Sequence, residues 1–304
     1  MILNISGRSD IVAFYTPWFR KRLQEGFVDV RNPFYPRLIQ RIFFEDVDAI
    51  VFCTKNPLPI LPYLSEITIP IIFQVTLTPY HKDLEPNLPP KGQIIEGIKK
   101  LATIIPKEFL YVRYDPILIN PTYTLDYHIR AFQNLCQKLD GSVSQIIVSF
   151  VDHYKNVENN ASTLQLKNIT EEDLKIIGTE FSAIAKKHHM TVQTCAEKND
   201  LHEYGFLKRD CVDFTTLFKL TGKTHFTEWK ARNNPYCHCA KMIDIGAYNS
   251  CPHRCKYCYA NFKEEEIHNN QKQHDPNSSL LLGHIQETDE IKKLSDKRSH
   301  FYVE

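Results

Sequence analysis

Three cysteines near the C-terminus offer the clearest chemistry in this sequence. Cys251, Cys255 and Cys258 lie in the run Cys-Pro-His-Arg-Cys-Lys-Tyr-Cys-Tyr-Ala, which we call the three-cysteine motif. Thiolates at this spacing can each bind one iron of a single [4Fe-4S] cluster. The fourth iron then has no protein ligand and stays open to a molecule that brings its own donor atoms. The motif therefore predicts a metal cluster that also binds a small molecule.

A structural zinc site is the alternative interpretation of the same residues. Short cysteine runs also form zinc knuckles and ribbons, which usually combine two Cys-x-x-Cys or Cys/His hairpins. The sequence has one such hairpin here, from Cys255 to Cys258. His253, or the upstream run Cys237-His238-Cys239, could complete a tetrahedral zinc site.

Four further cysteines could form a second metal site, and we call them the four-cysteine group. Cys195 ends a predicted strand, Cys211 follows after about the length of a helix, and Cys237 and Cys239 precede the three-cysteine motif. Four thiolates suit a second iron-sulfur cluster or one tetrahedral zinc ion. We favour a second cluster over zinc at the four-cysteine group. The cluster of the three-cysteine motif would need an electron path, which a neighbouring cluster could provide. The alternative is that Cys195 and Cys211 are small buried hydrophobic residues.

Alternating β-rich and helical segments must position these residues. Six β-rich runs are predicted strands, namely Ile2 to Ser6, Ala49 to Thr54, Ile71 to Thr78, Phe109 to Arg113, Gln145 to Phe150 and Met190 to Thr194. Helical periodicity predicts helices over Pro17 to Gln24, Lys91 to Ile104, Leu125 to Leu139 and Glu171 to Lys187. The gap between the second and third strands is rich in proline, so its crossover should be brief or irregular. This pattern predicts an α/β fold with parallel strands in a sheet or barrel.

Polar residues collect where each predicted strand ends. They are Arg8, Asp10, Lys55, Asn56, Thr78, Tyr80, Arg113, Asp115, Ser149, Asp152, Cys195 and Glu197. The carboxyl ends of parallel strands meet at one edge of a sheet or barrel, and β/α proteins place their sites there. A single one of these residues, such as Lys55 or Asp152, could equally be a loop cap or a solvated charge. Their recurrence after all six strands predicts one shared pocket.

Composition narrows the class of protein. The chain has 304 residues, of which 42% are hydrophobic and 24% charged, so it can bury a large core. We expect a β/α barrel over 1–200 and a cysteine-rich region with a hydrophilic tail over 201–304, packed as one unit. A formal charge of +1 gives no overall field for nucleic acid. Nine cysteines, without a signal peptide or an apolar span, are typical of a reducing compartment, and we expect a cytoplasmic location away from the membrane.

The three-cysteine motif, with Tyr257 directly before its last cysteine, resembles the signature of the radical S-adenosylmethionine superfamily. Most of the chain is similar to the domain-of-unknown-function 1848 family, whose members resemble that superfamily but carry the cysteines near the C-terminus. The matching segments are 8–15, 30–34, 54–57, 76–80, 85–90, 113–117, 244–248, 255–261 and 279–283. The resemblance implies a partial (β/α)6 TIM-like barrel, with the cluster loop after the last strand instead of the first.

The resemblance also implies a cofactor pair. The three-cysteine motif would hold a [4Fe-4S] cluster and S-adenosylmethionine would bind beside it, giving a 5'-deoxyadenosyl radical in an enzyme of unknown reaction. Tyr257 would pack near the adenine or over the cluster. From their strand-end positions, we expect Arg113 to bind the methionine carboxylate. Asp115 and Glu197 could bind the ammonium group or the ribose hydroxyls. The catalytic residues and the substrate remain unassigned.

The expected chemistry would require partners, and other functions are also compatible with the sequence. A radical enzyme of this kind would need an electron donor such as flavodoxin or ferredoxin, and an unknown small-molecule or macromolecular substrate. One rival is a zinc-stabilised binding protein without enzymatic activity. Another is a radical DNA-repair lyase resembling spore photoproduct lyase, although the near-neutral charge disfavours nucleic acid as a partner. A third is an electron-transfer protein that uses its clusters without cleaving a bond.

Overall fold

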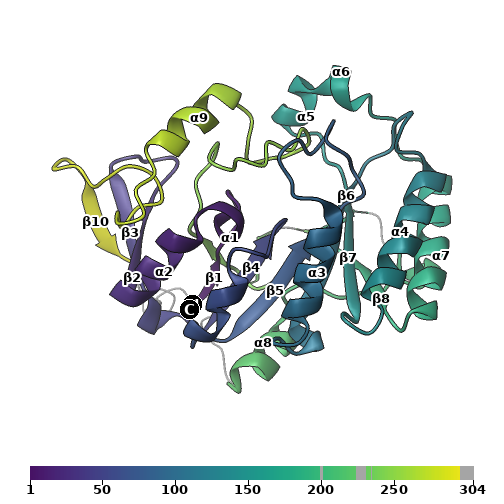
Figure 1. The fold of residues 1–304 in the computed structure, drawn as a ribbon, viewed down its shortest axis with the longest axis horizontal. Helices are drawn as coiled ribbons and strands as arrows, with labels where there is room; N and C mark the ends of the chain where they lie inside the picture. The colour runs from purple at the N-terminus through teal and green to yellow at the C-terminus, as the bar shows by residue number, and fades with distance from the viewer. Residues whose placement is uncertain (199–200, 224–230, 234, 295–304) are drawn as a thin grey trace.

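A seven-stranded sheet with parallel neighbours forms the centre of the computed structural model (Figure 1). The structure describes residues 1–198, 201–223, 231–233 and 235–294. The strand order is β8-β7-β6-β5-β4-β1-β9. In chain order these strands are β1 (Ile2–Asn4), β4 (Ala49–Thr54), β5 (Ile71–Thr76), β6 (Leu110–Ile117), β7 (Gln145–Phe150), β8 (Thr191–Thr194) and β9 (Ile243–Asp244). The predicted α/β class is confirmed.

The six strands predicted from the sequence correspond to β1 and to β4 through β8. The four predicted helices correspond to α2 (Thr16–Glu25), α3 (Lys91–Leu101), α4 (Leu125–Leu139) and α7 (Glu171–Lys187). Between β4 and β5 lies the 3-10 helix Leu61–Glu66, in agreement with the brief crossover expected from the prolines. The other α-helices among the described residues are α1 (Ile11–Phe14), α5 (Lys155–Asn159), α6 (Ala161–Leu164), α8 (Phe214–Thr221) and α9 (Glu264–Lys272).

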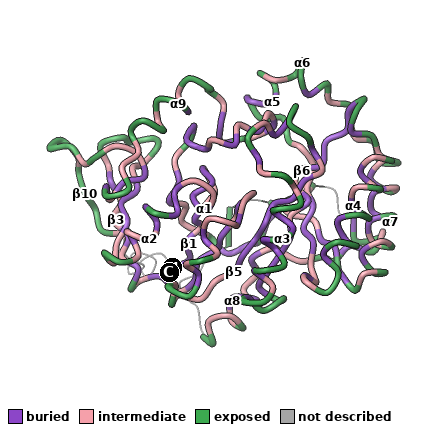
Figure 2. The backbone as a smooth tube through the Cα atoms, viewed as in Figure 1, coloured by how far each residue is buried: buried purple, intermediate pink, exposed green. Residues whose placement is uncertain are grey.

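Helices α4 and α7 cover one face of the sheet, because apolar side chains on that face pack against them. The ring of Tyr114 on β6 lies 5.5 Å from Phe132 of α4 and 5.6 Å from Phe181 of α7, centroid to centroid. Both helices begin at a threonine cap: Thr124 accepts a hydrogen bond from the third residue of α4, and Thr170 forms a capping box with Asp173. In Figure 2 the strands of the large sheet are largely buried, whereas α4 and α7 also carry exposed positions.

The opposite face of the sheet carries polar side chains and meets the segment between β8 and α8. Gln74 on β5 donates a hydrogen bond to the carbonyl of Cys211 at 3.5 Å, and Gln193 on β8 forms a β-bridge with Leu207. Because strand residues alternate between faces, Gln74 and Thr76 point away from the helices that Phe73 and Val75 face. Strand β5 is thus buried on both faces but carries polar side chains on one of them. This indicates that the polar face lines a functional site.

Strand β9 is an element that the sequence analysis missed. It pairs in parallel with β1, through Leu3 with Ile243 and Asn4 with Asp244. The chain after β9 therefore leaves the sheet at its carboxyl edge and runs directly into the three-cysteine motif. The predicted division at residue 200 remains a prediction, but β9 inserts a piece of the second part into the sheet of the first.

The second sheet was also not predicted. It consists of β2 (Phe27–Arg31), β3 (Leu38–Phe43) and β10 (Glu290–Lys293), in the order β10-β3-β2. The hydrophilic tail is anchored beside it, because Leu280 and Leu281 are buried and the indole of Trp18 donates a hydrogen bond to the carbonyl of Ser278 at 2.9 Å. Residues 295–304 of the predicted tail lie outside the described residues.

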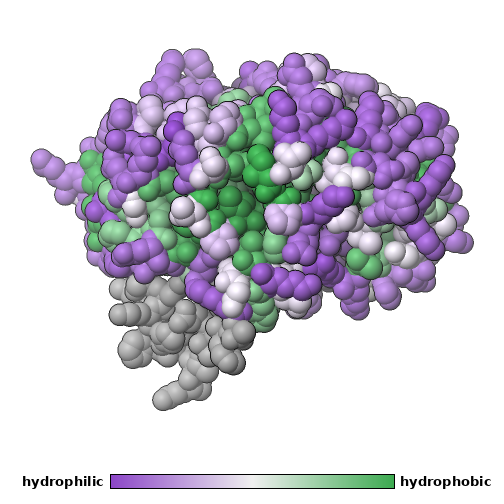
Figure 3. All heavy atoms as spheres, turned by 60° about the horizontal axis from the view of Figure 1, so that its bottom comes forward, coloured by the Kyte–Doolittle hydropathy of each residue, from purple (hydrophilic) through white to green (hydrophobic). Residues whose placement is uncertain are grey.

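The surface carries both hydrophobic and hydrophilic residues. Figure 3 shows hydrophobic residues near the middle of one face, with hydrophilic residues around them. Within the described part of the chain, no helix combines the length and the apolar character needed to cross a bilayer.

Candidate functional site

A cavity of about 660 Å³ opens at the carboxyl edge of the large sheet. This volume lies in the range of sites for small molecules and cofactors. Nine of the residues predicted from strand ends line it, namely Arg8, Asp10, Lys55, Arg113, Asp115, Ser149, Asp152, Cys195 and Glu197. Asn56, Thr78 and Tyr80 are not among the lining residues; Tyr80 instead donates its hydroxyl to the carbonyl of Pro116 at 2.7 Å.

The three-cysteine motif forms one wall of this cavity. Cys251, Cys255 and Cys258 all line it, although the first two are only 8% and 6% exposed. Asn261 closes the loop, because its side-chain amide donates to the carbonyl of Cys251 at 2.7 Å and its oxygen faces the Cys251 backbone N–H at 3.4 Å. The backbone N–H of Cys258 donates to the carbonyl of Cys255 at 3.2 Å. These bonds turn the three thiols toward the same space.

Burial raises the pKa of all three thiols above the ordinary value for cysteine. Their mutual proximity adds to the effect for Cys251 and Cys255. Three buried thiolates would therefore need a nearby positive charge, which a bound metal centre supplies when it replaces the protons. The donor set thus fits a thiolate-bound metal, since Cys251, Cys255 and Cys258 come from one closed loop and leave a cavity on their open side.

His253, within the same motif, joins it to the N-terminal part of the chain. Its Nε2 lies 3.0 Å from Oδ2 of Asp10, and both residues line the cavity. The His253 side chain is buried, and among the described residues its Nδ1 has no hydrogen-bond partner. An unpartnered buried nitrogen is rare in a folded protein, and Nδ1 is available to accept a hydrogen bond from a group in the cavity or to bind a metal ion. Because Nε2 is held by Asp10, the zinc alternative would have to take His253 through Nδ1.

Tyr257 is held by a charged group that the sequence analysis missed. Its hydroxyl donates to the carboxylate of Glu85 and receives a hydrogen bond from Nζ of Lys55 at 2.9 Å. Glu85 is 1% exposed and accepts hydrogen bonds from Lys55 at 2.8 Å and from Lys91. Burial alone would raise the pKa of Glu85, but the charges and hydrogen bonds of the two lysines lower it to about 2. A buried ionised carboxylate therefore lies behind the cysteine loop.

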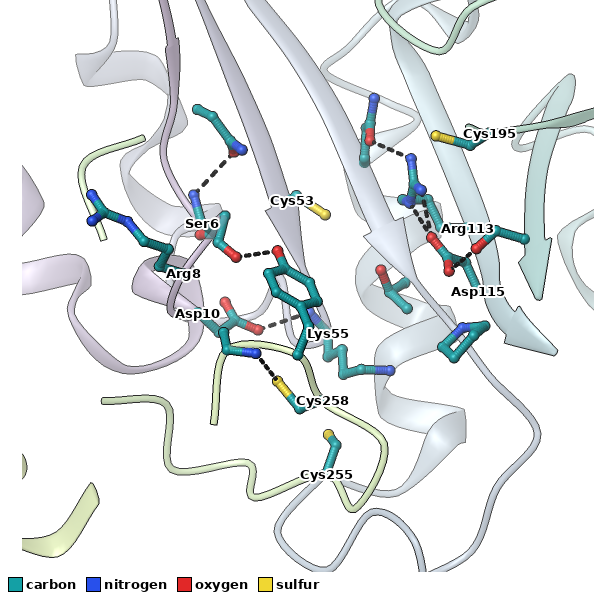
Figure 4. Close-up of a pocket in the computed structure, with 18 of the residues that line it drawn as sticks. Ser6, Arg8, Asp10, Cys53, Lys55, Arg113, Asp115, Cys195, Cys255 and Cys258 are labelled. Carbon is teal, nitrogen blue, oxygen red and sulfur yellow. Dashed lines mark hydrogen bonds and ion pairs between the residues drawn. The ribbon is translucent and has the colours of Figure 1, made fainter. Parts of the chain in front are cut away.

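Arg113 and Asp115 form a pair on β6, on the other side of the cavity. Nε of Arg113 lies 2.9 Å from Oδ2 of Asp115, and Nη1 donates to Gln74 at 3.1 Å. The hydroxyl of Ser149 donates to the other oxygen of Asp115. In Figure 4, Cys195 lies close to this pair, whereas Cys258 lies on the far side of the Lys55 side chain. The predicted carboxylate-binding role of Arg113 would thus compete with its contact to Asp115.

Glu197 is the most perturbed carboxyl group in the cavity wall. Burial, together with the charges of Asp152 and Asp115, raises its pKa to about 7, although a hydrogen bond from the Phe150 backbone N–H at 2.8 Å opposes this. A carboxyl group that titrates near neutral pH inside a cavity is a common feature of functional sites. Glu197 can therefore change charge in response to a bound ligand.

The structure brings the four-cysteine group together. Sγ of Cys211 lies 3.5 Å from Sγ of Cys195 and 3.3 Å from Sγ of Cys239. Sγ of Cys237, Sγ of Cys239 and a carboxylate oxygen of Asp210 lie within 4.8 Å of one another. Cys195 and Cys211 also line the cavity, so the group borders the same space as the three-cysteine motif. His238, considered for the zinc alternative, is 75% exposed in its side chain.

The fold and the site together define an α/β protein with a cysteine-walled cavity at the carboxyl edge of a parallel sheet. The model of the family described as "Domain of unknown function (DUF1848)" matches residues 2–260, and the chain belongs to this family. The family resemblance inferred from the sequence is thereby confirmed. No curated protein matches the chain.

Glu85, Lys91 and Asn261 are the site residues that sequence reasoning missed. Glu85 and Lys91 lie between β5 and α3 or at the start of α3, in a stretch without strand periodicity. A signal was available for Glu85 and Asn261, because segments 85–90 and 255–261 both belong to the family resemblance. The contact of Glu85 with Tyr257 joins segments far apart in the sequence, which no local pattern indicates, whereas Asn261 contacts Cys251 within the cysteine loop itself.

Proposed function

We propose that this chain is a radical S-adenosylmethionine enzyme in which Cys251, Cys255 and Cys258 hold a [4Fe-4S] cluster. The observation that carries the proposal is that three thiols of one loop reach the same cavity as the polar ends of the parallel strands. With S-adenosylmethionine bound in that cavity, such a cluster would supply the one electron needed to break its sulfonium C–S bond, which gives methionine and a 5'-deoxyadenosyl radical. An electron donor such as flavodoxin or ferredoxin would be the partner.

The strand order supports this proposal. Strands β1 and β4 through β8 follow one another in the sheet in chain order, as the strands of a partial (β/α)6 barrel do. The motif follows β9, which lies beside β1, so a C-terminal loop reaches the position next to the first strand. The unusual place of the cysteines in the sequence is therefore compatible with the proposed chemistry.

The residues of this chain would bind and orient the ligand. The carboxylates of Asp115 and Glu197 can accept hydrogen bonds from an ammonium group or from ribose hydroxyls. Tyr257 cannot rotate freely, because Lys55 and Glu85 both hold its hydroxyl, so its ring keeps a constant position in the cavity wall. The burial of Cys251 and Cys255 limits the access of water to these two thiols, which favours retention of an oxygen-sensitive metal centre.

The test compares the wild-type protein with the triple variant C251A/C255A/C258A, both purified without oxygen. We expect the wild type to hold iron and acid-labile sulfide, to bind S-adenosylmethionine, and to form 5'-deoxyadenosine when reduced by dithionite. The triple variant should lose the ligand binding and the product. Cys53→Ala is the matched control, because Cys53 lines the cavity but belongs to neither cysteine set, and it should retain both.

Two outcomes would contradict the proposal. Zinc in the three-cysteine motif, with no iron after anaerobic reconstitution, would favour the zinc-stabilised binding protein. A reconstituted cluster that neither binds S-adenosylmethionine nor yields 5'-deoxyadenosine would favour the electron-transfer protein.

A further inference from the structure

We propose that Cys195, Cys211, Cys237 and Cys239 bind a metal ion of their own, in a site separate from the three-cysteine motif. This inference does not depend on the proposed function, because it concerns different residues and a different part of the cavity wall.

Backbone contacts hold the three segments that supply these thiols. Cys195 directly follows β8, where the Gln193 bridge to Leu207 places the next segment alongside. The backbone N–H of Ala240 donates to the carbonyl of Val212 at 3.0 Å, which joins the segment of Cys239 to that of Cys211. The convergence of the four thiols is thus built into the main chain and does not depend on side-chain rotamers alone.

The sulfur positions indicate the kind of metal. In a tetrahedral site with metal–sulfur bonds of about 2.3 Å, neighbouring sulfurs lie about 3.8 Å apart. The sulfur of Cys211 lies 3.5 Å from that of Cys195 and 3.3 Å from that of Cys239. In a cubane cluster each cysteine binds a different iron, so the sulfurs lie farther apart than around one ion. These two spacings, together with the placement of Cys237 and Cys239 within 4.8 Å of each other, are closer to those around a single tetrahedral ion, for which zinc is the usual choice, than to those of the second cluster favoured by the sequence.

Neither a disulfide bond nor simple apolar packing explains the positions of the four sulfurs as well as a shared metal ion does. All four cysteines are free, and Cys211 contacts two sulfurs at once, whereas a disulfide would need only one partner at about 2.05 Å. Isolated buried cysteines behave as small hydrophobic residues, but such packing gives no reason for sulfurs from three segments to meet. A shared metal ion explains both the number and the contacts of the thiols.

The surroundings supply the charge and the hydrogen bonds that a four-thiolate site needs. Four thiolates around one divalent ion leave a net negative charge, and Arg113 on β6 borders the cavity wall formed by Cys195 and Cys211. Gln74 donates to the carbonyl of Cys211 at 3.5 Å. On the opposite side, Asp210 accepts the backbone N–H of His238 at 2.8 Å, which orients the turn between Cys237 and Cys239. These contacts would hold the ligands and leave the cavity accessible.

The experiment starts from the C251A/C255A/C258A protein, so that any bound metal reports on the four-cysteine group. This protein is purified without oxygen after expression with added zinc and, separately, after reconstitution with iron and sulfide. We expect about one zinc ion per chain and no acid-labile sulfide. Adding C237S/C239S should abolish the metal, whereas adding C53A should leave it in place.

A cobalt titration keeps the test independent of whether the Cys237/Cys239 variant folds. When Co²⁺ alone is added to the metal-free C251A/C255A/C258A protein, we expect the intense visible absorption of a tetrahedral cobalt thiolate, saturating at about one ion per chain. Zinc added afterwards should bleach it. If the protein binds iron and sulfide in place of zinc, the four-cysteine group is a metal site, but the proposal of a single metal ion is wrong.

The absence of any metal or cobalt spectrum in this protein, with circular dichroism like that of the wild type, would overturn the site altogether. Failure of the proposed function would look different. It would remove 5'-deoxyadenosine formation from the wild type, and the zinc of the four-cysteine group would remain.

Discussion

Nε2 of His253 lies 3.0 Å from Oδ2 of Asp10, so two residues from opposite ends of the chain meet beside the cavity. Asp10 also accepts hydrogen bonds from the Ala13 backbone, from Thr54 at 2.7 Å and from the Lys55 backbone at 2.8 Å. One carboxylate thus joins the start of α1, the end of β4 and the three-cysteine motif. This contact explains how a C-terminal loop keeps a defined position over the N-terminal strands.

Replacing Asp10 should therefore loosen the cysteine loop. In Asp10→Ala, several donors that are buried or partly buried lose their acceptor, each at a cost of about 1–3 kcal/mol. We expect the free energy of unfolding to fall by about 3 kcal/mol in urea titrations. Glu96→Gln is the control, because its ion pair with Lys99 is exposed and should contribute about 0–1 kcal/mol. Equal stability of the two variants would contradict the docking role of Asp10.

Replacing Glu85 should leave two half-buried lysines facing each other. Glu85→Gln removes the only carboxylate that the structure places between Lys55 and Lys91 in the described part of the chain. Loss of one partner of a buried ion pair costs about 3–5 kcal/mol, so we expect a marked drop in the free energy of unfolding. Glu66→Gln, which breaks the exposed pair with Arg20, is the control. A drop no larger than that of the control would show that solvent already screens this group.

The pH dependence of stability should also report Glu85. Its folded-state pKa of about 2 lies below the ordinary value of 4.5, so it contributes stability above about pH 4.5. That contribution should be lost as pH falls from about 4.5 to about 2, because the unfolded chain takes up the proton first. Urea titrations of metal-free protein across this range should show a shallower fall for Glu85→Gln than for the wild type. Parallel curves would contradict the assignment.

Glu197 should make ligand binding sensitive to pH near neutrality. Because its pKa is raised to about 7, the carboxyl group is mostly neutral at about pH 6 and mostly ionised at about pH 8. We expect the affinity for the cationic S-adenosylmethionine to rise up to about tenfold between these values, measured by calorimetry on the anaerobic protein. Glu197→Gln should bind weakly at both, whereas the exposed Glu203→Gln should behave like the wild type. A pH response that survives in Glu197→Gln would assign it to another group.

Replacing Arg113 should show whether this residue binds the ligand or only holds the cavity wall together. If it binds the methionine carboxylate, Arg113→Ala should weaken S-adenosylmethionine binding by about tenfold or more, the usual range for a charged hydrogen bond. Arg113→Lys should not restore binding fully, because lysine lacks the fork that contacts Asp115 and Gln74. Arg8→Lys is the control, since Arg8 lines the cavity but pairs with Asp244. Unchanged binding in Arg113→Ala would leave Arg113 a structural role, through its contacts with Asp115 and Gln74.

Much of the fold was accessible from local patterns. Strands such as β4 and β7 are short, apolar and bounded by turns, so periodicity located them within a residue or two. Helix α7 has a capping box and an apolar stripe, which predict it equally well. Strand β9, with only two residues, has no such pattern. It forms because β1 offers an unpaired edge, and that edge exists only in the folded sheet.

The candidate site also has one part that local sequence patterns determined and another that only the fold determined. Spacing along the chain determined that Cys251, Cys255 and Cys258 share one loop, because a few covalent bonds keep them within reach of one metal centre. The alternation of strands and helices likewise determined that polar strand ends would meet at one edge.

Only the tertiary structure decided which distant residues complete the site. It placed Asp10 against His253, Glu85 behind Tyr257, and the thiols of the four-cysteine group in a chain of neighbouring sulfurs. Such contacts depend on how segments far apart in the sequence pack, and packing depends on the shape of the entire core. Local spacing carries no information about that shape, which is why the sequence alone determined the type of ligands and the fold determined their arrangement.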